Sequence, residues 1–242
     1  VHLYVDADVW PLISALAVGF DRTGGSPAVV VGVARQFHWH HLPSAVRAER
    51  LLDRHWIVHV AHDGRSRQLT ETRLFDVIAD RYDLEVDPQR NRANVRMLLD
   101  LVGARPDHRI LDFGCGPGLA QGAGPQVELV GCDASAAMRA RARAHGLRVL
   151  EPGELADHED SVDGMIASYV LHLGVPSGDL VAATRCVRPG GRVAANFHKG
   201  RGVDEAARVL TERAGLVEVT AARRDDTPHG LVRVWQRVRM RP

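Results

Sequence analysis

A glycine-rich turn that directly follows an apolar segment constrains this chain more than any other feature. The stretch Arg109-Ile-Leu-Asp-Phe-Gly-Cys-Gly-Pro-Gly118 predicts a short buried strand and then a loop with glycines at 114, 116 and 118. Glycine has no side chain, so a ligand can approach the backbone there, and the chain can adopt unusual dihedral angles. In doubly wound sheets, ligands bind beyond the carboxyl ends of the strands. The turn therefore predicts a site for a nucleotide-like ligand at this strand end.

An acidic residue closes the next apolar segment. Asp133 lies in Gly131-Cys-Asp-Ala-Ser135, where a carboxylate can accept hydrogen bonds from both hydroxyls of a ribose. The glycine spacing GxGxG differs from the GxGxxG of nicotinamide and flavin enzymes, so a nicotinamide oxidoreductase is the least favoured reading. Only fifteen positions lead from Gly118 to Asp133, and glycines within them leave room for about one helical turn.

From residue 108 the sequence alternates between apolar strands and helices, which predicts an α/β fold with a mostly parallel, seven-stranded, doubly wound sheet. We expect a helix from Ser135 to the residue before Gly146, and a second over Val203 to Ala214 that stops at Gly215. The expected strands are Arg109–Phe113, Val127–Cys132, Leu147–Leu150, Val162–Tyr169, Arg192–Phe197, Leu216–Ala221 and Leu231–Val238.

Two amphipathic helices, around 71–82 and 91–102, precede this region. We therefore divide the chain into a module of residues 1–70 and a ligand-binding domain of residues 71–242. The first module is expected to be a small α/β or lid unit. Its expected elements are strands at 2–6, 28–37 and 56–61 and helices at 11–20 and 42–55.

A histidine cluster in the first module raises a metal hypothesis. His38 and His40 would point the same way on a strand, near His41, His59 and His62. No acidic or cysteine ligand has matching spacing, so we predict no metal and favour a substrate or partner surface.

Composition excludes several classes. The formal net charge is +1, which gives no electrostatic case for nucleic acid or an anionic membrane as partner. The three cysteines are too few and scattered for a disulfide framework. No apolar run approaches the roughly 18 residues of a membrane helix, and the N-terminus lacks a basic region before an apolar stretch. These features favour a cytoplasmic protein.

Several segments, taken in order, give the chain a resemblance to the class I S-adenosylmethionine-dependent methyltransferases, in the small-molecule, type 11 or 25-like group. The resemblance implies a Rossmann-like fold, S-adenosylmethionine as cofactor and S-adenosylhomocysteine as product. The matching segments are Phe75–Asp83, Ile110–Gly118, Asp133–Ser135, Glu151–Asp163, Ala167–His172 and Val187–Arg192.

The resemblance also implies roles for individual residues. Asp112 and the glycine turn would hold the methionine part of the cofactor, with Tyr82 over it, and Asp133 would bind the ribose. Ala134, Glu151, Gly153 and Glu154 would lie at the adenine, where Glu151 replaces a commoner aspartate. The expected cofactor-binding residues are Tyr82, Asp112, Gly114, Gly116, Gly118, Asp133, Ala134, Glu151, Gly153, Glu154 and Ser168.

Two histidines are candidates for a general base. His172 follows the fourth expected strand and His198 follows the fifth, both at carboxyl ends beside the cofactor crevice. The alternative interpretations are that His172 only packs against or orients its neighbours and that His198 lies in a solvated loop.

The leading functional hypothesis is methyl transfer to an O, N or C atom of a small metabolite. A non-methylating enzyme such as a cyclase, which would use the cofactor structurally, and a non-catalytic partner subunit are the alternatives. By analogy with the resembled family, residues 1–70 are expected to form a lid or a homodimer contact.

Overall fold

The computed structural model describes residues 29–33, 46–52, 55–60, 75–76, 79, 82, 88–124, 126–173, 175–197, 200, 202–222, 224–227 and 230–238. The chain divides into two compact units, Val1–Asp80 and Arg81–Pro242. Each unit is described by itself.

The described part of the first unit is a three-stranded antiparallel sheet in the order β1-β3-β2. Its strands are β1 (Val29–Val33), β2 (Val46–Leu52) and β3 (His55–Val60). The helix predicted over 42–55 is therefore wrong. Its residues have moderate helix propensity, but β2 pairs with β3 as a hairpin, and backbone pairing overrides a weak local preference. The segments predicted at 2–6 and 11–20, and the histidines at 38, 40, 41 and 62, lie outside the described residues.

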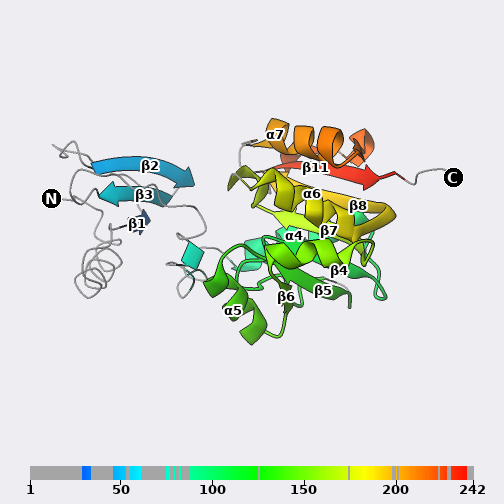
Figure 1. Ribbon diagram of the computed structural model, residues 1–242, viewed down its shortest axis with the longest axis horizontal. Helices are drawn as coiled ribbons and strands as arrows, with labels where there is room; N and C mark the ends of the chain where they lie inside the picture. The colour runs from blue at the N-terminus through cyan, green and yellow to red at the C-terminus, as the bar shows by residue number, and fades with distance from the viewer. Residues whose placement is uncertain are drawn as a thin grey trace. The chain divides into compact units, whose positions relative to one another are not determined.

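The second unit is built on one mixed sheet in the order β10-β11-β8-β7-β4-β5-β6, with β9 also paired to β11 (Figure 1). Strands β6, β5, β4, β7 and β8 are parallel, and β11 runs antiparallel to β8. All seven predicted strands are present, and the short β10 is an additional one. The strands are β4 (Arg109–Phe113), β5 (Glu128–Cys132), β6 (Arg148–Leu150), β7 (Val162–Ser168), β8 (Val187–Phe197), β9 (Leu216–Glu218), β10 (Arg224–Thr227) and β11 (Gly230–Arg237).

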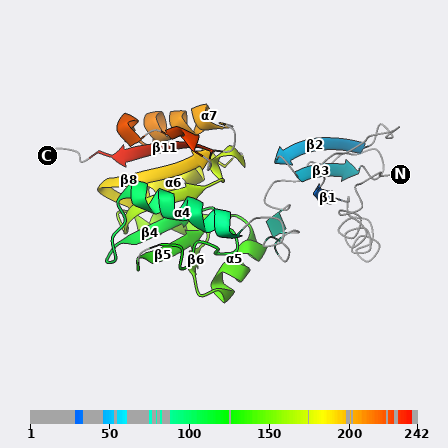
Figure 2. The same ribbon diagram turned by 180° about the vertical axis from the view of Figure 1, so that it is seen from behind.

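Helices cover both faces of this sheet. On one face lie α4 (Pro88–Val102) and α5 (Ala136–Ala144), and α4 is in front of the sheet in Figure 2. On the other lie α6 (Ser177–Cys186) and α7 (Val203–Arg208), which continues as a π-helical segment, Val209–Arg213. None of the helices among the described residues has the length and apolarity needed to span a bilayer.

The predicted helix boundaries largely hold. Ser135 caps α5 by accepting a hydrogen bond from the Met138 N–H, and the helix ends before Gly146 as expected. Helix α4 begins at Pro88, earlier than the expected 91, because proline suits the first helical position, where no backbone N–H is needed. Helix α6 was not predicted.

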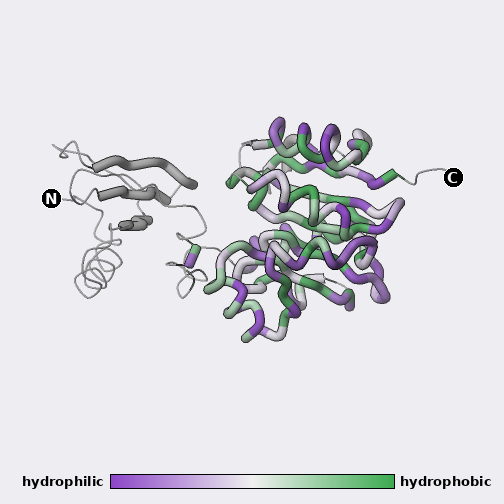
Figure 3. The backbone as a smooth tube through the Cα atoms, viewed as in Figure 1, coloured by the Kyte–Doolittle hydropathy of each residue, from purple (hydrophilic) through white to green (hydrophobic). Residues whose placement is uncertain are grey.

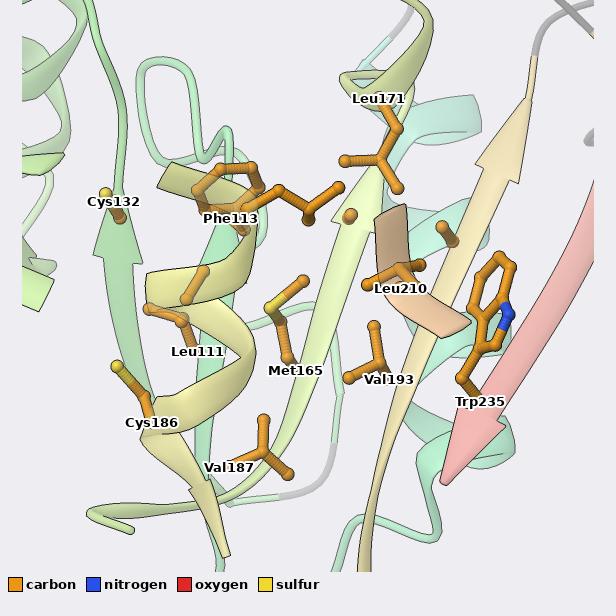
Figure 4. Close-up of a cluster of buried hydrophobic side chains, with 14 of the residues drawn as sticks. Leu111, Phe113, Cys132, Met165, Leu171, Cys186, Val187, Val193, Leu210 and Trp235 are labelled. Carbon is orange, nitrogen blue, oxygen red and sulfur yellow. The ribbon is translucent and has the colours of Figure 1, made fainter. Parts of the chain in front are cut away.

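Strand residues alternate between two apolar cores, as the two-residue period of a strand requires. Leu111 and Phe113 of β4 face α6 and α7, together with Met165, Val193 and Trp235 of the neighbouring strands (Figure 4). Ile110 faces α4 instead. Apolar stretches run through the strands, while α7 alternates between hydrophilic and hydrophobic residues (Figure 3).

Three polar residues interrupt the α4 core at the carboxyl ends of adjacent parallel strands. They are Asp112 of β4, Ser168 of β7 and Asn196 of β8. Each lies two positions after a residue of the α4 core in the same strand, so it lies on the same face of the sheet. The chain adds β5 and β6 on one side of β4 and then β7 and β8 on the other. The strand order thus reverses between β4 and β7, which is where ligands bind in such sheets.

The connection from β4 to β5 is a series of turns. Hydrogen bonds close successive turns from Gly118 N–H to Cys115 O and from Gln121 N–H to Gly118 O, and the described residues 114–124 contain no helix. The expected shortening of this connection is confirmed.

Gly131, in the middle of the sheet beside Asp112, allows a test of this packing. A Cβ atom there would lie 2.7 Å from the Cys115 Sγ and 2.8 Å from Leu147 Cδ2. We expect Gly131→Ala to lower the free energy of unfolding by about 1–3 kcal/mol in chemical denaturation, through overpacking. Gly178→Ala in α6 is the matched control, because a Cβ atom there meets nothing within 4 Å. It should be neutral or stabilising by up to about 1 kcal/mol, and equal stabilities for the two variants would contradict the packing.

Candidate functional site

The three glycines of the turn after β4 all have positive φ, at 75°, 53° and 85° for Gly114, Gly116 and Gly118. Left-handed backbone favours glycine at each of them. Their surroundings differ, however, and give each glycine its own further reason.

Gly114 and Gly118 are packing glycines. A Cβ atom on Gly114 would lie 2.4 Å from a methyl carbon of Val170, in the loop after β7. A Cβ atom on Gly118 would lie 3.1 Å from the Cα of Ala142, so this glycine lets α5 approach the turn. Gly116 has open space instead, with Tyr82 as its nearest neighbour at 3.9 Å. Gly116 is therefore the position where the backbone is exposed to a ligand.

The carboxylate of Asp133 fastens this turn to the end of β5. Its Oδ2 accepts a hydrogen bond from the Gly116 N–H at 2.9 Å, and its Oδ1 accepts one from the Ser135 N–H at 2.8 Å. An ionised carboxylate has about four acceptor positions. Asp133 is half-buried, so part of its side chain is within reach of a ligand.

Asp112 is a buried acid beside this turn. Burial raises the pKa of its carboxyl to about 7, and the charge of Asp133 adds to the rise. Ser168, at the end of β7, has a buried hydroxyl oxygen with no hydrogen-bond partner in the part of the chain that the structure describes. Buried polar groups of this kind are uncommon and are satisfied by water or a ligand.

One hollow lies at this carboxyl end of the sheet, and residues of β4, β7 and α4 line it. Five of the predicted cofactor residues line it: Tyr82, Asp112, Gly114, Gly116 and Ser168. Sequence reasoning missed the other six, which are Asn91, Val95, Cys115, Pro117, Leu119 and Ala120. Asn91 and Val95 are one helical turn apart on α4, a spacing visible in the sequence, but only the strand order shows that this helix covers β4 and β7.

The other predicted cofactor residues lie around the ends of β5 and β6. Arg139 of α5 joins the two ends, because it donates to the carbonyl oxygens of Asp133 and Ala134 at 2.9 Å and lies 3.2 Å from a Glu151 carboxylate oxygen. Glu154 accepts a hydrogen bond from the Glu151 N–H at 2.7 Å. Ala134, Glu151, Gly153 and Glu154 are exposed, so this rim is open to a ligand.

The two candidate bases are not tested by this geometry. The backbone of His172 belongs to a short 3-10 turn, Leu171–Leu173, directly after β7, and its side chain lies outside what the structure describes. His198 also lies outside the described residues.

Comparison with known proteins gives the site a family context. Residues 110–191 match the family model of the methyltransferase domain. A demethylmenaquinone methyltransferase from Beutenbergia cavernae is 35% identical over 130 residues, which cover 50% of this chain and 54% of that protein. An uncharacterised 37.1 kDa protein of transposon TN4556 from Streptomyces fradiae is 36% identical over 116 residues, which cover 42% of this chain and 33% of that protein. The chain thus spans between a third and about half of the length of these curated relatives.

Solved structures share the fold at low identity. A methyltransferase candidate from Haloferax volcanii, solved in complex with the activator Trm112, has a TM-score of 0.53 and 18% identity, covering 68% of this chain and 98% of its own. A candidate S-adenosylmethionine-dependent methyltransferase from Methanococcus maripaludis has a TM-score of 0.51 and 12% identity, covering 73% and 98%.

The strand order, with the glycine turn at the point where it reverses, defines a Rossmann-like domain. Residues 110–191 are similar to the methyltransferase domain family, and the fold is shared with solved structures of S-adenosylmethionine-dependent methyltransferases.

The buried Asp112 generates a prediction about pH. The pKa of its carboxyl is 3.8 in an ordinary setting and about 7 in the folded chain, so folding favours the protonated form. Its contribution to stability is complete below pH 4 and is lost as the pH rises through about 7. Asn cannot ionise, so Asp112→Asn should exceed the parent chain in free energy of unfolding at pH 8 by up to about 4 kcal/mol, at about 1.4 kcal/mol per pH unit.

The advantage of Asp112→Asn should shrink towards zero at pH 4, as measured by urea unfolding at both pH values. Asp107→Asn makes the same change on the exposed surface and is the control. A stability difference for Asp112→Asn that is the same at pH 4 and pH 8 would contradict the buried, raised-pKa carboxyl.

Proposed function

We propose that this chain transfers a methyl group from S-adenosylmethionine to an O, N or C atom of a small metabolite. The observation that carries the proposal is the hollow at the strand reversal, where the open Gly116 backbone meets two acids and an unsatisfied buried hydroxyl. The family match over residues 110–191 supports it.

The residues at the hollow fit the chemistry of this cofactor. Its ribose presents hydroxyl donors, which the half-buried carboxylate of Asp133 would accept. Its methionine end carries positive charge, which suits the buried Asp112 and the Ser168 hydroxyl oxygen. We assign Tyr82 and Gly116 to the methionine end, and the rim formed by Ala134, Glu151, Gly153 and Glu154 to the adenine.

The cofactor, when bound, supplies an electrophilic methyl group on a sulfonium. The chain's own residues would hold that group in line with the acceptor and exclude water, and such alignment lowers barriers by roughly 7–11 kcal/mol. The hollow lies between α4 and the strand ends, so its apolar wall of Val95, Leu119 and Ala120 would keep water from the reacting atoms.

For acceptors that lose a proton, we assign the general base to His172 or His198, which follow the carboxyl ends of β7 and β8. A positioned base contributes about 10²–10⁴-fold. Replacing the operative histidine with Ala should lower turnover by that factor and leave the affinity for S-adenosylhomocysteine unchanged. Full methyl transfer by both single variants would remove the base from the mechanism.

A small-molecule acceptor is the class that we propose. The chain shares 35% identity with a methyltransferase named for demethylmenaquinone, and the net charge of +1 offers little attraction for nucleic acid. All three cysteines are free, as in a reducing compartment, which supports a cytoplasmic location. We further propose that residues 1–70 act as a lid or a dimer contact.

Calorimetric titration with S-adenosylmethionine and S-adenosylhomocysteine tests the cofactor site. We expect binding in the micromolar range. Asp133→Asn should weaken it tenfold or more, or about 1.4 kcal/mol, because one acceptor oxygen for the ribose is lost. Asp107→Asn, an exposed acid in the turn before β4, is the matched control and should bind like the parent chain.

The outcomes separate the competing functions. Binding without release of S-adenosylhomocysteine across a broad acceptor screen would favour the non-methylating enzyme. A folded chain that binds neither compound would refute the methyltransferase and favour a partner subunit. Unchanged affinity in Asp133→Asn would refute the ribose assignment alone.

A further inference from the structure

Tyr169, the first residue after β7, has a strained backbone. Its φ is +54°, and among the described residues only Asp160 shares a left-handed φ without being glycine. Aspartate tolerates this region because its short side chain bonds locally, but for other residues it costs about 1–2 kcal/mol. Strain held at the end of a strand beside a ligand hollow indicates a functional constraint.

Two contacts from the rest of the fold hold this conformation. The Tyr169 N–H donates to the Asn196 Oδ1 at 2.8 Å, so a side chain of β8 replaces the next backbone pairing of the ladder. Asn196 is fully buried, which fixes its amide. The following residue, Val170, packs onto the bare Cα of Gly114.

The Tyr169 side chain joins a polar cluster with Arg90, Asn94 and Asn196. Burial raises the pKa of the half-buried Tyr169 phenol, while the charge of Arg90 and hydrogen bonds from Asn94, Arg90 and Asn196 oppose the rise. The phenol therefore keeps its proton at neutral pH and can donate it in a hydrogen bond. Asn94 is 1% exposed, and its Oδ1 has no partner among the described residues.

Residues next to the cluster in the chain line the cofactor hollow. Ser168, which precedes Tyr169, lines that hollow. Asn91 and Val95, the neighbours of Arg90 and Asn94 on α4, line it as well. An acceptor held by this cluster would lie next to the methionine end of the cofactor.

We propose that Arg90, Asn94 and Tyr169 form the acceptor-recognition site, and that the acceptor carries an acidic oxygen beside an O–H or N–H group. This inference rests on the proposed methyltransferase function. A guanidinium and a phenol are both donors, so together they select a carboxylate or an ionised enol or phenol. The unpartnered Asn94 Oδ1 supplies one acceptor for the neighbouring O–H or N–H group.

The test uses the full chain saturated with S-adenosylhomocysteine and titrated with 2-hydroxybenzoate. The neutral amide of the same shape, 2-hydroxybenzamide, is the comparison ligand. We expect the acid to bind at least tenfold more tightly than the amide. Tyr169→Phe and Arg90→Gln should each weaken binding of the acid fivefold or more, with the affinity for S-adenosylhomocysteine unchanged.

Two controls separate recognition from structure. Tyr169→Phe keeps the ring and the strained backbone, so a purely structural role for Tyr169 predicts parent-like binding of the acid. Arg92→Gln removes another exposed arginine of α4 and should behave like the parent chain.

Equal affinity for acid and amide, no binding of the acid, or parent-like binding by both Tyr169→Phe and Arg90→Gln would overturn the inference. In those cases S-adenosylhomocysteine still binds and the proposed function stands. Failure of S-adenosylhomocysteine itself to bind would instead refute the proposed function, and the inference with it.

Discussion

The two hydrogen bonds to the Asp133 carboxylate are the interaction on which the site depends. One oxygen holds the turn after β4 through Gly116, and the other holds the start of α5 through Ser135. Two strand ends and a helix N-terminus thus share one charged group. Hydrogen bonds to charged acceptors are about twice as strong as neutral ones. The backbone at Gly116 is therefore already positioned, and little ordering is left for ligand binding to accomplish.

A buried acid gives this site an electrostatic character that the fold itself does not need. Asp112 occupies a core position of β4, where an apolar residue would pack at no electrostatic penalty. Its raised pKa shows that the folded chain disfavours the carboxylate unless positive charge is near. Asn196 and Asn94 are likewise polar side chains that the fold buries. Burying these polar groups costs stability at the carboxyl ends of the parallel strands, and the residues that line the hollow lie at the same ends.

Much of this arrangement could be predicted from the sequence, because short apolar strands, capped helices and a glycine turn each have local signals. The seven strands and the cap at Ser135 were found in this way, whereas the five predicted residues that line the hollow came from the glycine turn and from the resemblance to a methyltransferase family. Strand β2 was missed, because residues 46–52 also suit a helix and only their pairing with β3 overrides that preference. Asn91, Arg90 and Tyr169 were also beyond local reasoning. Their place beside the hollow depends on the order of strands β4, β7 and β8, and the positive φ of Tyr169 cannot be predicted from the residue types around it.

The contact between Gly114 and Val170 joins the cofactor turn to the loop that carries Tyr169, and this has an evolutionary consequence. A side chain at 114 would collide with Val170. Shortening Val170 to make room would still leave the left-handed strain at 114. Position 114 should therefore keep glycine over evolutionary time even where position 170 changes, so that the turn limits the path by which the loop after β7 can diverge.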